Sequence, residues 1–420
     1  PSTMEICEAA NEMNLPCIKL GSSSLYQIGY GKQGRLIEAS IGNGTSCIAV
    51  DISCDKVLTK ELLGIQNIPV AEGYKVPNVV KLIKYANKIG YPVVLKPQFG
   101  NQGNCVRLNI KNDKQLLDEY EKLTRQYNDI IIEKYHKGDD YRVCVVNGKV
   151  VAVSKRVPPY ITGDGVSSIK QLIDSLNDDE LRGEGHEKPL TKIKIDDEVL
   201  KNLKENNLEL NSILDKGFKL QLRDNANLST GGTAIDYTDK ICNENIDLCI
   251  RASKAIGLDI CGIDICANDI TKPLNEDEII LEVNAAPGLR MHTTPSTGAK
   301  RRIGAEIINM MYNNRPKNIP VVAITGTNGK TTTTRIINST LSKMGYCTGM
   351  TSTEGIYIDG KCIDKGDDTG FNSAKCVLLN KDVDVAVLET ARGGIIKKGL
   401  AYDLADVAVL TNITEDHLGC

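Results

Sequence analysis

The stretch VVAITGTNGKTTTTR, residues 321–335, constrains the fold of this chain more than any other part of it. Its apolar start predicts a buried strand, the small residues around Gly326 and Gly329 predict a turn, and the run from Lys330 onward predicts a helix. Such a loop directs backbone N–H groups and a helix N-terminus at one point, which favours phosphate. Lys330 can reach the outer phosphates, and Thr331 can bind Mg²⁺. The predicted ATP-binding residues are Gly326, Thr327, Asn328, Gly329, Lys330, Thr331 and Thr332.

Short β-rich runs alternate with helical patterns along nearly all of the 420 residues, which predicts a multidomain α/β fold. The stretch MYNNRPKNIP, residues 311–320, contains two prolines and predicts a linker. We therefore expect an initial segment at 1–50, a domain at 51–314 and a second domain at 315–420. The first domain should carry a polar insertion at about 163–228.

Several elements of the first domain can be assigned from local patterns. An Asn147-Gly148 pair predicts a hairpin turn between two strands. We interpret TSCIAVDIS, PVVLKP, DIIIEKY, LDICGIDICAND and EIILEVNAAPG as strands, and DKVLTKELLGIQ as a helix.

Composition excludes several classes of protein. The net charge is −3 with Lys and Arg scattered, and the absence of Trp removes a common base-stacking side chain, so we expect no nucleic-acid partner. No apolar run approaches the roughly 18 residues of a membrane span. The 14 cysteines form no CxxC pair, which is typical of reduced thiols in a cytoplasmic protein.

A second set of polar residues lies in the first domain. Lys56 lies in the predicted helix DKVLTKELLGIQ, and Lys96 ends a predicted strand just before FGNQGN, a turn able to close over phosphates. Glu133 ends another strand, where its carboxylate can accept a hydrogen bond from an adenine amino group, and Asp140 can meet a ribose hydroxyl. Each of these side chains alone could equally be a surface ion-pair partner.

Three oxygen-bearing side chains lie on the last two predicted strands of this domain. They are Asp264, Glu282 and Asn284. Two carboxylates and an amide oxygen suit Mg²⁺ rather than zinc.

Taken in this order, the residues resemble those of the ATP-grasp ligases over roughly residues 50–300. The resemblance implies an ATP-grasp fold in which Lys56 and Lys96 hold phosphates, Glu133 the adenine, Asp140 the ribose, and Asp264, Glu282 and Asn284 the magnesium. The stretch LRDNANLSTGG adds Arg223 and Asn225, which suit the charge that develops on a transferred phosphoryl group. An anionic substrate needs further partners, for which the candidates are Ser2, Arg142, Arg156 and Arg290. Of all these residues we assign Arg223, Arg290 and Lys330 to catalysis, and Ser2, Arg142, Arg156 and Asn225 to the substrate.

The loop around Gly326 and Gly329 departs from the strict phosphate-loop pattern G-x-x-x-x-G-K-[ST]. Position 324, where that pattern has its first glycine, is Ile. The loop's variant GTNGKTT resembles the loop of the Mur ligases, a likeness that covers residues 316–420. The resemblance implies a P-loop α/β domain in which Glu389, in VAVLETARGG, and His417, in NITEDH, bind metal along with Thr331. It also implies that this domain is incomplete, without the rest of a Mur-type centre or a C-terminal domain.

The joined sequence resembles the cyanophycin synthetase family, without that family's separate N-terminal domain. One loop departs from the family's usual G-N-H-G-R-G, since Gln102 and Asn104 stand where His and Arg are common. The stretches that match include EKYHKGDDYRVCVVNGKVVAVSKR, LSTGGTAIDYTD, EVNAAPGLRMH and LETARGGIIKKGLAYDLADVAVLTNITEDHLG.

This resemblance implies an ATP- and Mg²⁺-dependent ligase with two acyl-phosphate reactions. The first half would add aspartate to a cyanophycin or polyaspartate primer, and the second would add arginine to the aspartate side chain. It also suggests a homo-oligomer such as a tetramer. Two alternatives stay open: a related ligase that uses a different amine, and a nucleotide-binding module that has lost catalysis.

Overall fold

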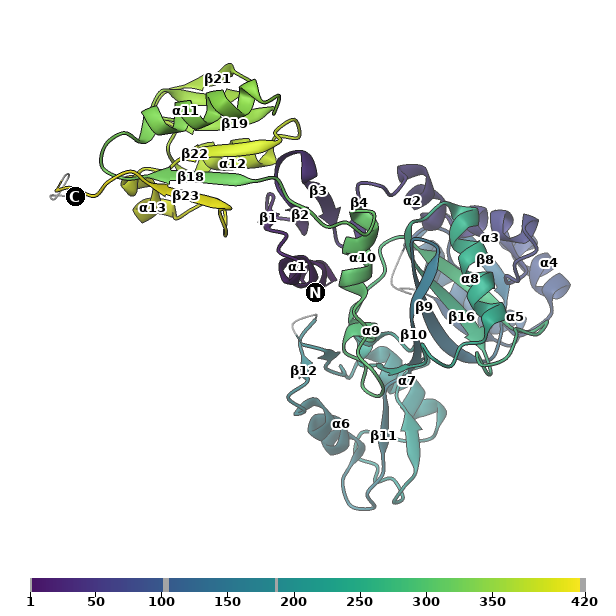
Figure 1. Cartoon of the computed structure of the whole chain (residues 1–420). Coiled ribbons are helices and arrows are strands. Elements are labelled where there is room, and N and C mark those ends of the chain that lie inside the picture. Colours follow the sequence, from purple (N-terminus) through teal and green to yellow (C-terminus); the bar gives the residue numbers. More distant parts are fainter. Residues whose placement is uncertain (1, 101–105, 186–187, 416–420) are drawn as a thin grey trace. The chain divides into compact units, whose positions relative to one another are not determined.

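The computed structural model describes residues 2–100, 106–185 and 188–415. The chain forms two compact units, which are described separately (Figure 1). The first contains Pro1–Glu5 and Gly44–Ile307, and the second contains Ile6–Asn43 and Ile308–Cys420. The segment expected to precede the first domain therefore groups largely with the second unit. None of the described helices combines the length and the apolar character that crossing a membrane requires.

A four-stranded antiparallel sheet with the order β5-β8-β6-β7 begins the first unit. Two amphipathic helices pack against it and enclose a core around Leu82, Leu95 and Leu116. Both helices begin at an Asn whose side chain accepts a hydrogen bond from the first turn, Asn78 for α4 and Asn112 for α5. The elements are β5 (Gly73–Val76), α4 (Val79–Ile89), β6 (Val93–Pro97), β7 (Arg107–Ile110), α5 (Asp113–Thr124) and β8 (Ile130–Lys134).

A five-stranded antiparallel sheet with the order β15-β10-β9-β16-β17 is the centre of the first unit. The predicted hairpin is confirmed, because Asn147 and Gly148 join β9 to β10 with φ values of 50° and 68°. Helix α8 packs against β9, β10 and β16, and helices α2 and α3 pack against β17. The elements are α2 (Cys47–Cys54), α3 (Lys56–Ile65), β9 (Asp139–Val146), β10 (Lys149–Val157), β15 (Thr233–Asp236), α8 (Asn243–Ile256), β16 (Ile260–Ala267) and β17 (Ile279–Asn284).

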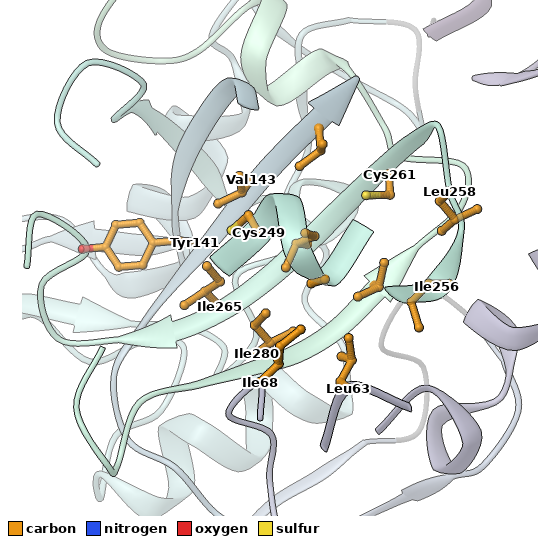
Figure 2. Close-up of a cluster of buried hydrophobic side chains, with 14 of the residues drawn as sticks. Leu63, Ile68, Tyr141, Val143, Cys249, Ile256, Leu258, Cys261, Ile265 and Ile280 are labelled. Atoms are coloured by element: carbon orange, nitrogen blue, oxygen red, sulfur yellow. The ribbon is translucent and has the colours of Figure 1, made fainter. Parts of the chain in front are cut away.

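The two faces of this sheet differ in chemistry because side chains alternate along each strand. One face is apolar: Tyr141, Val143 and Ile265 pack with Cys249 of α8 and Leu63 of α3 (Figure 2). The residues between them on the same strands point to the opposite face, which carries charged side chains. These are Asp140 and Arg142 on β9, Arg156 on β10, Asp264 on β16 and Glu282 on β17.

One predicted strand is wrong. TSCIAVDIS, interpreted as a strand from its apolar and β-branched residues, contains helix α2. Ser46 starts the helix by accepting a hydrogen bond from the backbone N–H of Ala49. Packing against α3, α8 and β17 then outweighs the local preference for extended backbone.

The polar insertion folds around a small core of its own, which includes Ile173, Val199 and Leu220. Strands β11 and β14 pair antiparallel at its base. Its elements and those that follow are β11 (Tyr160–Thr162), α6 (Ile169–Asn177), β12 (Arg182–Gly183), β13 (Leu190–Thr191), α7 (Asp197–Glu205), β14 (Lys219–Gln221), a 3₁₀ turn (Leu228–Thr230) and α9 (Arg290–Thr293). Helices α1 (Ser2–Glu12) and α10 (Ile303–Met311) each contain a point where the chain passes between units.

The second unit is built on a six-stranded sheet with the order β21-β20-β19-β22-β18-β23. Strands β19, β22, β18 and β23 are parallel, and β20 and β21 add an antiparallel edge. The elements are β18 (Val321–Thr325), α11 (Lys330–Lys343), β19 (Thr348–Ser352), β20 (Gly355–Ile358), β21 (Lys361–Lys365), α12 (Phe371–Leu379), β22 (Val385–Glu389), α13 (Arg392–Lys398) and β23 (Val407–Leu410).

The N-terminal strands of the second unit form a separate four-stranded sheet attached to the same core. The backbone N–H of Tyr30 donates to Asn318 Oδ1 at 2.7 Å, and Gln27 Nε2 donates to the carbonyl of Leu378 at 3.1 Å. The elements are β1 (Cys17–Lys19), β2 (Leu25–Ile28), a 3₁₀ turn (Gly31–Gln33), β3 (Arg35–Glu38) and β4 (Ile41–Gly42).

Candidate nucleotide and metal sites

A buried carboxylate with two lysines lies at the inner strands of the four-stranded sheet. Glu133 on β8 forms ion pairs with Lys96 on β6, at 2.7 Å, and with Lys60 on α3. The two lysines use different carboxylate oxygens, Oε2 for Lys96 and Oε1 for Lys60. Burial alone would raise the pKa of Glu133, but the two ammonium groups outweigh it and lower that pKa to about 2. The carboxylate is therefore ionised throughout the physiological range.

Lys56 lies at the start of α3, which Asp55 caps through the backbone N–H groups of Val57 and Leu58. Its Nζ donates to the carbonyl of Gly100 at 2.7 Å, at the beginning of the predicted phosphate loop. Burial lowers the pKa of Lys56, and the nearby Lys96 lowers it further. Residues 101–105 lie outside the described part of the chain, and with them Gln102 and Asn104.

The charged face of the five-stranded sheet is organised by the register of its strands. Asp264 on β16 lies opposite Arg142 on β9 and opposite Glu282 on β17. Arg142 donates to both oxygens of Asp264, with Nη2 at 2.9 Å from Oδ2, and Arg156 Nη2 donates to Oδ2 at 3.1 Å. Burial alone would raise the pKa of Asp264, but the two guanidinium groups lower it to about 2. Two residues predicted to bind substrate and one predicted to bind metal thus form one buried cluster.

Asp140 belongs to the same face, since it lies opposite Arg156 in the pairing of β9 with β10. Burial raises the pKa of Asp140, and the charge of Arg156 opposes that effect. Its position beside the cluster is compatible with the predicted contact to ribose.

The donor set predicted for Mg²⁺ is brought together by β16 and β17. Glu282 lies opposite Asp264, and Asn284 lies opposite Gly262. Asn284 Nδ2 donates to Glu282 Oε1 at 3.1 Å, so the three side chains share one region of the sheet. Two carboxylates and an amide oxygen fit Mg²⁺. In the described part of the chain no group of three His, Cys, Asp or Glu side chains forms a metal site, and Asp264 already accepts from Arg142 and Arg156, so the metal role of this set stays a prediction.

The segment after β17 contacts Ser2 through Leu289 and contains Arg290. Ser2 Oγ accepts a hydrogen bond from the backbone N–H of Leu289 at 3.1 Å. Arg290 donates to the carbonyl of Lys188 at 2.9 Å and to Thr191 Oγ1 at 3.3 Å.

Arg223 and Asn225 are held by acidic residues of the insertion. Arg223 forms ion pairs with Asp196 and with Glu198, the latter at 2.7 Å. Asn225 Nδ2 donates to Glu198 Oε1 at 3.1 Å. These contacts occupy both side chains within the insertion, and their role toward a phosphoryl group stays a prediction.

Two buried residues of the first unit, Lys60 and His292, were not among the site residues predicted from the sequence. Lys60 lies four residues after Lys56, on the same face of α3, and that spacing was the signal that could have identified it. His292 on α9 is 1% exposed, and its Nδ1 lies 2.7 Å from Ser154 Oγ. Burial lowers the pKa of His292 to about 3, with help from Arg142, so its imidazole is neutral at physiological pH.

The loop after β18 in the second unit has the predicted form, with α11 beginning at Lys330. Gly326 has φ of +134°, and a Cβ there would collide with Thr411 Oγ1, so glycine is required. The backbone N–H groups of Thr327 and Asn328 donate to Asn412, at 3.0 Å to its carbonyl and 2.9 Å to its Oδ1. Lys330 Nζ folds back onto the carbonyls of Gly326 and Thr327, at 2.9 and 3.0 Å.

Glu389, at the end of β22, lies beside this loop because β22 and β18 are parallel neighbours. Thr331 Oγ1 donates to Glu389 Oε1 at 3.0 Å. Oε2 is buried and has no hydrogen-bond partner among the described residues, and burial raises the pKa of Glu389. A buried oxygen without a partner next to a hydroxyl group fits the predicted Mg²⁺ site. Gly329 and Thr332 flank Lys330 and Thr331 at the start of α11, whereas His417 lies outside the described residues.

Both halves of the chain match models of known protein families. The family model of the RimK-like ATP-grasp domain matches residues 51–160 and 217–311, and that of the Mur ligase middle domain matches residues 324–420. The gap between the two ATP-grasp segments contains most of the insertion. The chain therefore combines an ATP-grasp domain with a Mur ligase middle domain.

Over its whole length the chain is similar to cyanophycin synthetases, as expected from the sequence. It is 44% identical to those of Crocosphaera subtropica and Geminocystis herdmanii, which it covers to 49% and 48%. All of this chain is matched in both cases, so it spans about half the length of these curated relatives. Among solved structures, a bifunctional glutathione synthetase from Pasteurella multocida is 28% identical with a TM-score of 0.58, over 75% of this chain and 43% of that one.

Proposed function

We propose that this chain is the ATP-binding part of a ligase that makes cyanophycin. One observation carries the proposal: the whole length of this chain is 44% identical to cyanophycin synthetases, and two separate sets of its side chains suit phosphate and metal. The first set would serve the addition of L-aspartate to the C-terminus of a polyaspartate backbone. The second set would serve the addition of L-arginine to the side chain of that aspartate.

Both reactions would proceed through an acyl phosphate. A carboxylate oxygen of the growing polymer attacks the γ-phosphorus of ATP, and the bond to the departing ADP breaks. The α-amine of the amino acid then attacks the acyl carbon, inorganic phosphate leaves, and the nitrogen loses a proton. The protein contributes mainly orientation and charge neutralisation, so no covalent protein intermediate is needed.

In the first reaction Lys56 and Lys96 would neutralise the phosphates, Glu133 would accept from the adenine amino group, and Asp140 would bind the ribose. Asp264, Glu282 and Asn284 would hold Mg²⁺, which when bound offsets the negative charge of the phosphates. Arg142 and Arg156 would bind the carboxylate of the polymer, for which both would have to leave the oxygens of Asp264.

In the second reaction the loop from Gly326 to Gly329 would cradle the phosphates, and Lys330 would turn from its own loop to the γ-phosphate. Thr331 and Glu389 would hold the second Mg²⁺. The observation that supports this assignment is that the buried Oε2 of Glu389 has no hydrogen-bond partner within the described part of the chain.

The test is phosphate release from ATP by the full-length protein, with a short aspartate–arginine primer and each amino acid added separately and together. We expect release with aspartate that Glu282→Ala abolishes, and arginine-dependent release that Lys330→Ala abolishes. Turnover with aspartate but with no response to arginine would mean that the second half uses another amine. No turnover with either would leave a nucleotide-binding module.

The family resemblance also supports a cytoplasmic homo-oligomer, for which a tetramer is the proposed state. Light scattering coupled to gel filtration of the full-length protein would measure the number of subunits.

A further inference from the structure

Glu133 is held by two lysines that differ in their surroundings. Lys60 comes from α3 and contacts Oε1, whereas Lys96 comes from β6 and contacts Oε2. Their side chains are 12% and 9% exposed, and that of Glu133 is 4% exposed. A third cation, Lys56, lies one helical turn before Lys60 and already contacts the loop at Gly100. One carboxylate therefore faces a crowded group of positive charges.

The proposed function gives Lys96 a second partner, because it turns to the phosphates when ATP binds. Glu133 would then lose the ion pair at Oε2 while it stays buried. A buried carboxylate without a counter-ion is strongly destabilised and takes up a proton instead. A protonated Glu133 would be a weaker acceptor for an adenine amino group than the ionised carboxylate. A cationic side chain must therefore stay paired with Glu133 throughout the reaction cycle.

Lys60 satisfies that requirement. Its ammonium group is buried against Glu133, and its helix reaches the phosphate loop through Lys56 rather than through Lys60 itself. Burial lowers the pKa of Lys60 to about 8, with Glu133 opposing the effect, so the group stays largely charged at neutral pH.

We propose that Lys60 is a positioning residue, the permanent counter-ion that holds Glu133 by Oε1 while Oε2 passes from Lys96 to the adenine amino group. This inference rests on the proposed use of ATP at this site. It assigns Lys60 to base recognition, and Lys56 and Lys96 to the phosphates.

The experiment measures equilibrium binding of ATP and of ITP to the full-length protein without amino acids. ITP carries a carbonyl oxygen in place of the 6-amino group, so the ratio of the two affinities reports the contact at the base. The variants are Lys60→Met, Lys60→Arg, Glu133→Gln and the double variant Lys60→Met/Glu133→Gln. Lys201→Met is the matched control, because Lys201 pairs with Glu205 on the exposed face of a helix.

We expect Lys60→Met to weaken ATP binding by about 10-fold or more and to weaken ITP binding far less, so that the preference for ATP falls. Lys60→Arg should restore most of the preference, and the double variant should match Glu133→Gln. The double variant and Glu133→Gln both leave Lys96 without its carboxylate partner, so the comparison of these two keeps the test valid if Lys60→Met folds poorly.

An equal loss of ATP and ITP binding in Lys60→Met would overturn the inference, since it would mean that Lys60 acts on the phosphates or on the fold alone. The inference would also be overturned if the double variant lost as much ATP-binding free energy as the two single variants together. Absence of ATP binding in the unmodified protein would instead overturn the proposed function, and the inference with it.

Discussion

Gly73 lies directly opposite Glu133 in the antiparallel pairing of β5 with β8. A Cβ atom at Gly73 would lie 2.6 Å from Cγ of Glu133 and 2.8 Å from the carbonyl oxygen of Ile132. The missing side chain therefore makes room for the Glu133 side chain in a tightly packed pair of strands.

The first prediction follows from that contact. Gly73→Ala should displace the Glu133 carboxylate and weaken ATP binding by roughly 10-fold, the cost of one lost hydrogen bond to a charged group. Titration calorimetry with ATP measures the change. Gly64→Ala is the matched control, because a Cβ at Gly64 would meet nothing within 4 Å. Equal affinities in both variants would show that the space at Gly73 is not needed.

The second prediction concerns acid stability. The pKa of Glu133 is about 2 in the folded protein and 4.5 for the free side chain, so the unfolded chain binds more protons between these values. The stabilisation is complete above about pH 4.5 and is lost as the pH falls toward about 2, on the order of 3 kcal/mol. Denaturant unfolding from pH 6 to pH 2 measures this slope, which should be shallower in the Lys60→Met/Glu133→Gln variant. The same slope in both proteins would contradict the prediction.

The third prediction concerns Asp264. Asp264→Asn leaves the buried guanidinium groups of Arg142 and Arg156 without a full counter-charge, which should lower the free energy of unfolding by about 3–5 kcal/mol. Chemical denaturation measures the loss. The control is Glu121→Gln, since Glu121 and Arg125 form an exposed pair that should contribute less than about 1 kcal/mol. Similar losses in the two variants would mean that the buried cluster adds nothing beyond a surface pair.

The fourth prediction concerns the metal requirement of the second unit. Glu389→Gln removes the charge from a candidate Mg²⁺ ligand, so arginine-dependent phosphate release should need at least about 10-fold more Mg²⁺. Magnesium titrations of the full-length protein provide the measurement, and aspartate-dependent release should keep its original midpoint. Glu354→Gln, in an exposed pair with Arg335, is the control. An unchanged Mg²⁺ midpoint in Glu389→Gln would rule out this carboxylate as a ligand.

Local sequence patterns were sufficient for much of the fold. The Asn147-Gly148 turn, helix α3 and the strand–loop–helix at Lys330 all follow from residues close together in the chain, and the structure has each of them. The exception, α2, shows the limit of such patterns, because the helix packs not only against the neighbouring α3 but also against α8 and β17, which are far away in sequence.

Contacts between residues that lie far apart in the chain could not be predicted from local patterns. The sequence suggested Asp264 as a metal ligand and Arg142 as a substrate ligand, but only the register of β9 with β16 makes them partners. The spacing of Lys60 from Lys56 could have placed it on the same face of α3, but its contact with Glu133 depends on the position of α3 relative to β8, which no local pattern encodes. The sequence therefore indicated candidate side chains for the sites, whereas the packing of the strands and helices determined which of these side chains are in contact.

Apolar and charged side chains alternate along the strands of the five-stranded sheet, and this alternation limits where residues can be inserted or deleted. Deleting one residue within β9 or β16 would reverse every side chain beyond the deletion, turning Arg142 or Asp264 into the apolar core and Val143 or Ile263 out of it. Gains and losses of residues in descendants of this chain should therefore collect in the insertion, whose separate core can absorb them. The two central strands should keep a constant length even where their sequences diverge.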